Sequence, residues 1–380
     1  MRLVVDVSKA GAPDGIGSWT RGLVRGLVDH LASADDYTVD QIVLCDLSGA
    51  LDETAIHEEF GDLDSRFDVS LTQPPSGEPG DVFLASSWQS PVAWHRPVVF
   101  VVYDLTVFSH PECHTVDNRI HTLEGCLHAL VNDATFLAIS EATASELERY
   151  LDVPRSEVAV VHPGLESRFA AAPTLDRDPE ALQRRLRDRF GLAGGYLLAV
   201  GSLEPRKNLE RLIDAHSRLD DEVRREHPLV VVGGGGWHNA VLEETLQRAE
   251  SRGDVHRMGR VTGSDLLHLY QGAAVFAYPS LAEGFGLPVL EAMACGAPVL
   301  TSDRSSMPEV VGDAARLVDP DDTEALRFAL AELLSDPNQR AELVSRGLRR
   351  ARDFSWTRAA AEILELCCSA SGRRSTDSSP

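Results

Sequence analysis

Lysine is nearly absent from this chain of 380 residues, in which Lys9 and Lys207 are the only two lysines and arginine supplies the remaining basic side chains. Acidic residues outnumber basic ones by 59 to 36, which gives a formal net charge of −23. Nucleic-acid binding requires a basic surface, so the composition excludes a nucleic-acid partner. The same charge weakens the case for docking to anionic lipid, so peripheral membrane contact is left open but not indicated.

Long hydrophobic runs and metal-binding motifs are missing as well. No apolar run approaches the ~20 residues that span a bilayer, and the N-terminus enters a predicted strand directly, which argues against a signal peptide. The six cysteines show no metal-ligand spacing, and the clustered acids at 319–322 are better explained as a turn and a helix cap. We therefore expect a cytoplasmic protein with no metal site.

Strand and helix signals alternate along nearly the whole chain, which predicts parallel sheets joined by crossover helices. A chain of 380 residues exceeds what one core comfortably supports, so two domains are expected. The alternation is interrupted at residues 165–195, which contain a basic amphipathic helix. Strands are predicted near 2–7, 39–46, 66–72, 81–86, 97–104, 135–140, 157–162, 196–200, 229–233, 255–259, 274–279, 298–302 and 316–318.

Two carboxylates, Glu283 and Glu291, lie eight residues apart around the predicted start of a short helix. Pro288 fits the first helical position, and the preceding strand places Glu283 at a carboxyl edge, where open α/β sheets bind ligands. The free amides at the helix start predict an anion site. Its expected backbone contacts are Gly284, Phe285, Gly286 and Leu287. Two acceptors that flank a phosphate-sized site suit a nucleotide sugar.

Two basic side chains, Arg206 and Lys207, are expected at the same edge, between a strand and a helix that Asn208 is predicted to cap. A diphosphate bound there would gain charge-assisted hydrogen bonds from both side chains. The alternative is a surface pair that opposes Glu204 or Glu210.

The segment around Glu283 and Glu291 closely resembles the E-x7-E signature of retaining glycosyltransferases with the GT-B fold, family 4. The resemblance implies an α/β fold of two Rossmann-like domains that face each other across a cleft. It places an acceptor domain at residues 1–170, completed by a C-terminal helix at 355–368. A linker at 171–195 and a nucleotide-sugar domain at 196–354 follow, and the small polar residues 369–380 are expected to be a disordered tail.

The same resemblance implies roles for individual residues. Arg206 and Lys207 match the family's phosphate clamp, Glu283 would contact hydroxyls of the transferred sugar, and Glu291 would contact the ribose. The backbone at Arg260 and Val261 would meet the nucleobase. In the first domain, Gly15 and Gly17 match the glycine loop that faces the donor phosphate.

One position departs from the family pattern: Tyr103 stands where many relatives carry histidine, immediately before Asp104. A role that needs an imidazole is therefore in doubt here. Asp104 either orients an acceptor hydroxyl or caps the loop that follows it.

The sequence thus predicts a retaining glycosyltransferase that moves a hexosyl group from a nucleotide-diphosphate sugar, GDP-mannose or a UDP-sugar, to a hydroxyl of a glycan, glycolipid or small molecule. It predicts no cofactor and no metal requirement. The alternatives are an NDP-sugar 2-epimerase, for which no convincing set of acids and histidines is visible, and a non-catalytic nucleotide-sugar-binding subunit.

Overall fold

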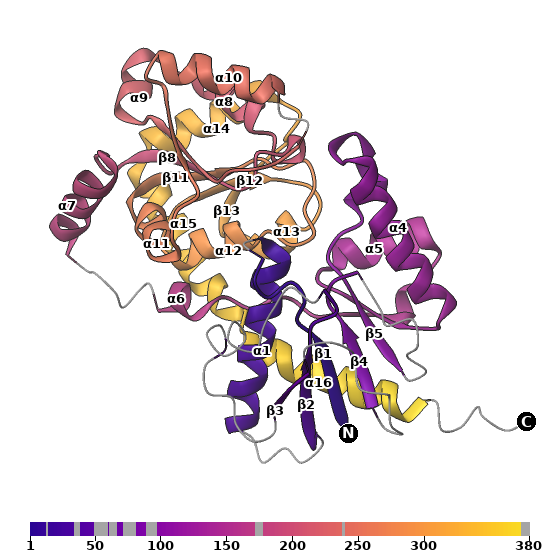
Figure 1. Ribbon diagram of the computed structural model, residues 1–380. Coiled ribbons are helices and arrows are strands. Elements are labelled where there is room, and N and C mark those ends of the chain that lie inside the picture. Colours follow the sequence, from indigo (N-terminus) through magenta and orange to yellow (C-terminus); the bar gives the residue numbers. More distant parts are fainter. Residues whose placement is uncertain are drawn as a thin grey trace, which may run out of the picture. The chain divides into compact units, whose positions relative to one another are not determined.

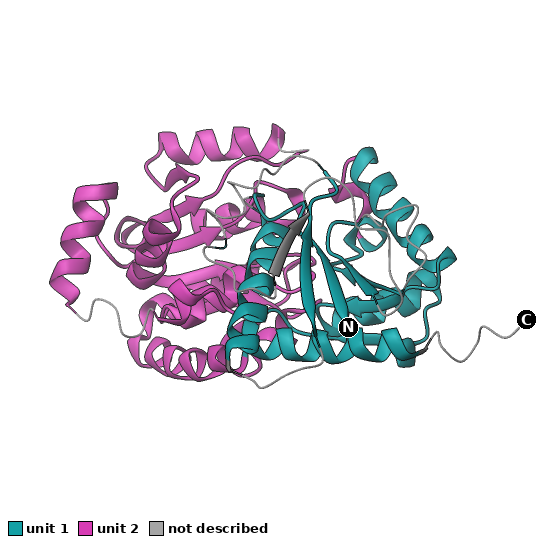
Figure 2. Cartoon of the chain, turned by 60° about the horizontal axis from the view of Figure 1, so that its bottom comes forward, with its two compact units in different colours: residues 1–109, 116–164, 354–380 teal, residues 110–115, 165–353 magenta. Residues whose placement is uncertain are grey.

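The computed structural model describes residues 1–12, 14–33, 39–48, 60, 67–70, 81–88, 97–171, 178–237 and 240–373. Within these residues every strand belongs to one of two parallel sheets, and each strand overlaps a segment that the sequence predicts as one. The chain divides into two compact units (Figure 2). Unit 1 comprises residues 1–109, 116–164 and 354–380, and unit 2 comprises residues 110–115 and 165–353.

Unit 1 contains a seven-stranded sheet with the order β3-β2-β1-β4-β5-β6-β7. Its first six positions follow the Rossmann order, in which two halves wind outward from the centre of the sheet. The strands are β1 (Arg2–Asp6), β2 (Gln41–Cys45), β3 (Phe67–Ser70), β4 (Asp81–Ala85), β5 (Val98–Val102), β6 (Thr135–Ala138) and β7 (Val158–Val160). Its helical segments are α1 (Gly15–Ser33), α3 (Thr106–Ser109), α4 (Val116–Val131), α5 (Glu141–Leu151), η2 (Arg155–Glu157) and α16 (Trp356–Arg373).

The last helix of the chain, α16, packs along the first helix, α1, inside unit 1 (Figure 1). Two glycines of α1 make this approach feasible: a Cβ at Gly22 would lie 2.0 Å from the Trp356 ring, and one at Gly26 would lie 2.4 Å from its carbonyl O. Trp356 also meets Trp19 edge to face, with ring centroids 6.0 Å apart. Helix α16 therefore contributes to the core of unit 1.

Unit 2 contains a six-stranded sheet with the order β10-β9-β8-β11-β12-β13, which is the Rossmann order again. Its strands are β8 (Tyr196–Val200), β9 (Leu229–Val232), β10 (Val255–Gly259), β11 (Ala273–Tyr278), β12 (Val299–Ser302) and β13 (Ala315–Val318). Its helical segments are η1 (Pro111–Cys113), α6 (Ser167–Ala170), α7 (Pro179–Phe190), η4 (Pro205–Lys207), α8 (Leu209–Ser217), α9 (Asp221–Glu226), α10 (Ala240–Ser251), α11 (Gly263–Gly272), α12 (Leu287–Ala294), α13 (Met307–Val311), α14 (Thr323–Ser335), α15 (Pro337–Arg350) and η5 (Ala351–Asp353).

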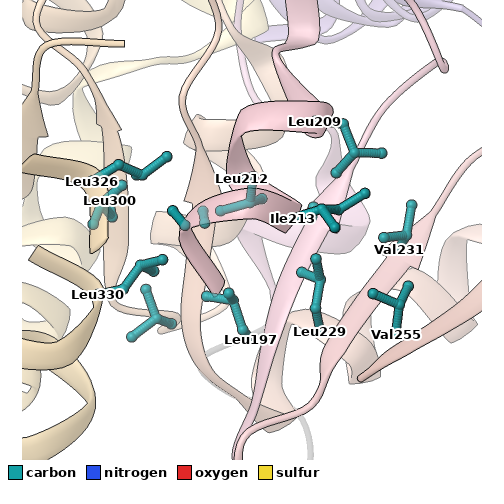
Figure 3. Close-up of a cluster of buried hydrophobic side chains, with 14 of the residues drawn as sticks. Leu197, Leu209, Leu212, Ile213, Leu229, Val231, Val255, Leu300, Leu326 and Leu330 are labelled. Atoms are coloured by element: carbon teal, nitrogen blue, oxygen red, sulfur yellow. The ribbon is translucent and has the colours of Figure 1, made fainter. Parts of the chain in front are cut away.

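One hydrophobic cluster in the core of unit 2 joins its sheet to α8, α10 and α14. Figure 3 shows Leu197 and Leu229 from the strands meeting Leu212 of α8, with Leu326 and Leu330 of α14 beside them. All five side chains are buried. These strands are apolar on both faces because helices cover both faces of a parallel sheet. Since the strands are parallel, their carboxyl ends all lie at the same edge of the sheet. That edge carries the candidate site.

Two Rossmann-like units in one chain form the GT-B architecture, as the sequence predicts. How the units face each other stays a prediction. Some expected boundaries differ from those of the structure: unit 1 ends at Gly164 rather than 170, and α7 of the expected linker 171–195 belongs to unit 2. Residues 172–177 of that linker, like 374–380 of the expected tail, lie outside the described residues.

The C-terminal helix is longer than the predicted 355–368. It continues to Arg373, and two serine hydroxyls in its last turns bond back to helix carbonyls: Ser369 donates to the carbonyl O of Glu365 at 2.9 Å, and Ser371 donates to that of Cys368 at 2.7 Å. In the described part of the chain, no helix is both long enough and apolar enough to cross a membrane.

Candidate active site

The two predicted cations lie where β8 ends. Pro205 begins the short helix η4, which carries Arg206 and Lys207 and ends at Asn208 in the left-handed conformation, with φ 58°. The expectation that the Asn208 side chain caps α8 is wrong. Its Nδ2 instead donates to the carbonyl O of Pro279 at 3.0 Å and of Pro320 at 2.7 Å. This amide therefore ties the turn that holds the cations to the loops after β11 and β13.

Glu283, on the loop after β11, is the carboxylate that meets both cations. It is buried, with 6% of its surface exposed. It accepts hydrogen bonds from Arg206 Nη1 at 2.6 Å and from Lys207 Nζ at 2.7 Å. Ser280 Oγ and the Tyr278 hydroxyl donate to the same carboxylate at 2.7 Å and 2.9 Å. The sequence motifs at 206–207 and 283 are thus one cluster in the fold.

A second carboxylate completes this cluster. Arg206 Nε donates to Glu204 Oε2 at 2.9 Å, and Ser202 Oγ donates to the other oxygen of Glu204. We call Glu204, Arg206, Lys207 and Glu283 the ion cluster. Its two cations and two carboxylates cancel in formal charge. The opposition between Arg206 and Glu204 that the sequence offers as an alternative therefore exists, but as part of this buried network rather than as a surface pair.

The protonation states in the cluster depend on one another. Burial opposes ionisation of Glu283, but Arg206 and Lys207 outweigh burial and lower the pKa of Glu283 to about 2. Burial and the neighbouring Arg206 lower the pKa of Lys207, while Glu283 and Glu204 oppose that shift. Glu283 and Glu204 therefore favour the charged form of Lys207, against the effect of burial. Burial and Glu283 raise the pKa of Tyr278, so its hydroxyl stays a donor.

Glu291, on α12, sits in a different environment. The Tyr270 hydroxyl of α11 donates to Glu291 Oε2 at 2.9 Å. Burial and the nearby Glu166 raise the pKa of Glu291 to about 8, against the effects of Tyr270 and Arg168. Glu166 itself pairs with Arg168 at 2.6 Å. The two carboxylates of the E-x7-E segment are therefore in opposite states at neutral pH: Glu283 is ionised and Glu291 is largely protonated.

The backbone between these carboxylates turns sharply into α12. Gly286 has φ +105°, a conformation that favours glycine, and a Cβ there would lie 2.3 Å from Met307 Cε. The Ser305 hydroxyl donates to the carbonyl O of Glu283 at 2.6 Å, and Ser306 Oγ donates to that of Phe285 at 2.9 Å. Gly284 and Phe285 are buried, and Leu287 begins α12. Pro288 has no N–H, and the N–H groups of Val289 and Leu290 donate to the carbonyl O of Gly286 at 3.0 Å and 3.3 Å. The predicted anion site thus lies on a braced helix start.

The residues predicted to meet the nucleobase follow β10 in unit 2. Arg260 is exposed, and Val261 is half-buried. The Arg260 side chain runs beside Gly234 and Gly235 after β9, and each would place a Cβ 3.8 Å from it.

The candidate glycines of unit 1 lie at the start of α1, which begins at Gly15. The N–H of Gly17 donates to Asp14 Oδ1 at 2.9 Å, and a Cβ at Gly17 would lie 1.9 Å from the carbonyl O of Ala12. Close packing of its own chain therefore explains Gly17. Gly15 is exposed, and nothing lies within 4 Å of the place where its Cβ would be.

Tyr103 and Asp104 directly follow β5. The Tyr103 ring is buried and meets Trp19 edge to face at 5.5 Å, and its hydroxyl donates to the carbonyl O of Ser86 at 2.7 Å. Tyr103 is thus part of the core of unit 1. Asp104 Oδ1 accepts from the N–H of Thr106 at 3.0 Å, so its side chain stabilises the turn that leads into α3. A role of Asp104 toward an acceptor stays a prediction.

Sequence reasoning missed several residues of the site. Tyr278, Tyr270 and Ser305 belong to no sequence motif. Their contribution is visible only in the structure, where their hydroxyls donate hydrogen bonds to Glu283 or Glu291. Glu204 offered a weak signal, because it stands two residues before Arg206. Among the described residues, no group of three or more His, Cys, Asp or Glu side chains is arranged to hold a metal ion.

Comparison with known proteins identifies similar chains. The family model described as glycosyl transferases group 1 matches residues 188–350. The chain is 36% identical over 260 residues to O-antigen chain mannosyltransferase B of Escherichia coli, covering 68% of this chain and 66% of that protein. It is 34% identical over 289 residues to the serotype-specific mannosyltransferase WbdA of Escherichia coli, covering 74% of this chain and 34% of WbdA. The chain thus spans just under two thirds of the first relative and about a third of the second.

Solved structures share the fold. The crystal structure of Anabaena Alr3699/HepE in complex with UDP and glucose has a TM-score of 0.73 at 18% identity, covering 97% of this chain and all of that chain. WaaG, a glycosyltransferase involved in lipopolysaccharide biosynthesis, has a TM-score of 0.68 at 16% identity, covering 96% of this chain and 99% of that chain. At these identities the likeness concerns the fold.

Proposed function

Because the chain belongs to the group 1 glycosyl transferases, we propose that it transfers a hexosyl group from a nucleotide-diphosphate sugar to an acceptor hydroxyl, with retention of anomeric configuration. The observation that carries this proposal is the ion cluster beside the start of α12. Two partly buried cations beside the start of a helix are groups that bind a diphosphate. The adjacent carboxylate Glu283 is an acceptor for sugar hydroxyls.

We propose a hexose donor with either GDP or UDP as its nucleotide. Mannosyltransferases among the relatives support GDP-mannose, and the UDP in the HepE structure supports a uridine nucleotide on this fold. The acceptor is proposed to be a hydroxyl of a glycan, a glycolipid or a small molecule. We propose that the backbone at Arg260 and Val261 binds the nucleobase. Backbone groups would recognise the base by its shape and its hydrogen bonds rather than by charge.

The ion cluster has a consequence for donor binding. Arg206 and Lys207 already bond Glu283, so phosphate oxygens must compete with that carboxylate for the same N–H groups. Hydroxyls of the transferred sugar would donate to Glu283 and replace what it loses. A full donor therefore satisfies the whole cluster, whereas a nucleotide diphosphate without its sugar leaves Glu283 short of partners. This arrangement favours the sugar-bearing donor over the product.

In the proposed reaction, the bond between the anomeric carbon and the diphosphate oxygen breaks. A bond from that carbon to the acceptor oxygen forms on the same face. The proton of the acceptor hydroxyl moves to the leaving diphosphate, so no protein nucleophile is needed. Arg206 and Lys207 stabilise the negative charge that develops on the leaving group. Glu283 orients the sugar, and Glu291 is assigned to the ribose.

The test is a donor screen with UDP-, GDP-, ADP- and dTDP-sugars, in which release of nucleotide diphosphate is measured with and without mannoside and glucoside acceptors. We expect acceptor-dependent release from a UDP- or GDP-sugar. Arg206→Ala should abolish most of this release, whereas the exposed Arg225→Ala should not. Epimerised donor without release would indicate a 2-epimerase, and tight donor binding without turnover across all acceptors would indicate a binding subunit. Either result would refute the proposal.

A further inference from the structure

Helix α4 of unit 1 presents an apolar stripe to solvent. Six of its hydrophobic side chains are exposed, with fractions between 37% and 84%: Val116, Ile120, Leu123, Leu127, Leu130 and Val131. The spacing 116, 120, 123, 127, 130 and 131 places them on one side of the helix. Scattered surface hydrophobics are ordinary, but a continuous stripe along a whole helix is typical of an interaction surface. We call these six residues the α4 stripe.

The packing of α4 fixes which side faces outward. Its buried side consists of Thr122, Gly125, Cys126 and Ala129, small residues that let the helix lie close to the body of unit 1. A Cβ at Gly125 would lie 2.5 Å from the carbonyl O of Trp88. Turning the stripe inward would bring leucine side chains into this space, which has no room for them. The packing of α4 therefore requires the stripe to face outward.

We propose that the α4 stripe is the contact surface between two copies of this chain, related by a two-fold axis. The argument rests first on area. The exposed fractions correspond to apolar surface on the order of 500 Å². A stable interface buries about 800 Å² per partner, so this stripe and a rim around it are sufficient. In a dimer with two-fold symmetry, the same surface patch of both copies forms the interface. The apolar stripe of one copy can therefore be buried against the same stripe of the second copy.

Charge is the second argument, and it separates a second copy from a lipid surface. Helices that lie on membranes carry many lysines and arginines on their polar side. Apart from its histidines, α4 has Arg119 as its one basic residue, against Asp117 and Glu124. The chain as a whole carries −23, which anionic lipid repels. A partner of the same chain needs no basic rim, and it offers an apolar stripe of matching length.

The test is sedimentation equilibrium of the full chain from low micromolar concentrations to about 100 µM. The wild type should show a reversible monomer–dimer equilibrium. Ile120→Glu/Leu127→Glu should raise the dissociation constant at least about 30-fold, because it places charge in the centre of the interface. The matched control Val241→Glu/Phe328→Glu changes two exposed hydrophobic residues of α10 and α14, and it should associate like the wild type. Circular dichroism of all variants checks that they are folded.

A second measurement locates the interface. Leu123→Cys lies in the middle of the stripe and should form an intermolecular disulfide under mild oxidation, whereas Val241→Cys should not. A wild type that stays monomeric over the whole range, or a stripe variant that dimerises like the wild type, would overturn the proposal. Wild-type monomers that sediment with phosphatidylcholine–phosphatidylglycerol vesicles through the stripe would also overturn it, in favour of a lipid surface.

Discussion

Replacing Glu283 with glutamine removes the charge that joins the two cations of the ion cluster while keeping the shape of the side chain. In the wild type, Arg206 and Lys207 bond Glu283 at 2.6 Å and 2.7 Å in a buried setting. Glu283→Gln leaves these two cations with Glu204 as the one carboxylate of the cluster. The pKa of Lys207, already lowered by burial and Arg206, should fall further. We expect a folded but clearly less stable unit 2.

The magnitude follows from the pKa of Glu283. The pKa falls from 4.5 to about 2 on folding, and each unit corresponds to about 1.4 kcal/mol, so the ionised carboxylate contributes about 3 kcal/mol. Because the folded-state pKa is depressed, this contribution is present in full above the unfolded pKa. It is lost as pH falls from about 4.5 toward 2. The difference between wild type and variant should therefore be about 3 kcal/mol near pH 7 and less than half of that near pH 3.

The measurement is guanidinium unfolding near pH 7 and pH 3, followed by hydrogen exchange of peptides from residues 273–294. These peptides report on unit 2 and not on the separate stability of unit 1. The control is Glu222→Gln on α9, an exposed position that should change stability by less than about 0.5 kcal/mol. A Glu283→Gln variant as stable as the wild type, or a gap that does not shrink at low pH, would refute the picture of a carboxylate held ionised by two cations.

Three further predictions concern ligand and protons. Arg206→Ala/Lys207→Ala and Glu291→Ala should each weaken nucleotide diphosphate binding about ten- to hundredfold per lost contact in titration calorimetry, and unchanged affinity would contradict the assigned roles. Turnover should survive EDTA, and loss of activity that Mg²⁺ or Mn²⁺ restores would show that a metal is needed. Because the folded-state pKa of Glu291 is raised to about 8, wild-type melting temperature should fall as pH rises from about 5 to 8, and Glu291→Gln should flatten this decline. An identical slope in scanning fluorimetry would contradict that protonation state.

The strands and the meeting of the main site motifs were predictable from the sequence. Apolar runs of four to eight residues between turn signals mark buried parallel strands, and the carboxyl ends of such strands share one edge. Segments 205–207 and 280–287 both follow strands of this kind, so their proximity follows from topology alone. In the structure, Arg206 and Lys207 of the first segment donate hydrogen bonds to Glu283 of the second.

Other features depend on side-chain directions that a linear pattern does not contain. Asn208 stands at a helix start, where its usual role is a cap, but its left-handed backbone turns the amide toward Pro279 and Pro320 instead. The α4 stripe has the spacing that normally indicates a core face, and only the packing of Gly125 against Trp88 shows that it points outward. In both cases the local sequence pattern is present, but contacts with residues distant in sequence determine which way the side chains point.

The neutrality of the ion cluster links stability to the proposed chemistry. A buried ammonium or guanidinium needs a nearby negative charge to stay ionised, and Glu204 and Glu283 supply it when no donor is bound. The same carboxylates then compete with a diphosphate for Arg206 and Lys207, so phosphate alone gains less than two uncompensated cations would offer. Under the proposed function, sugar hydroxyls that satisfy Glu283 would release the cations toward the phosphates. We therefore propose that one carboxylate couples recognition of the sugar to activation of its leaving group, and we expect the neutral variant of Glu283 to affect turnover more than product binding.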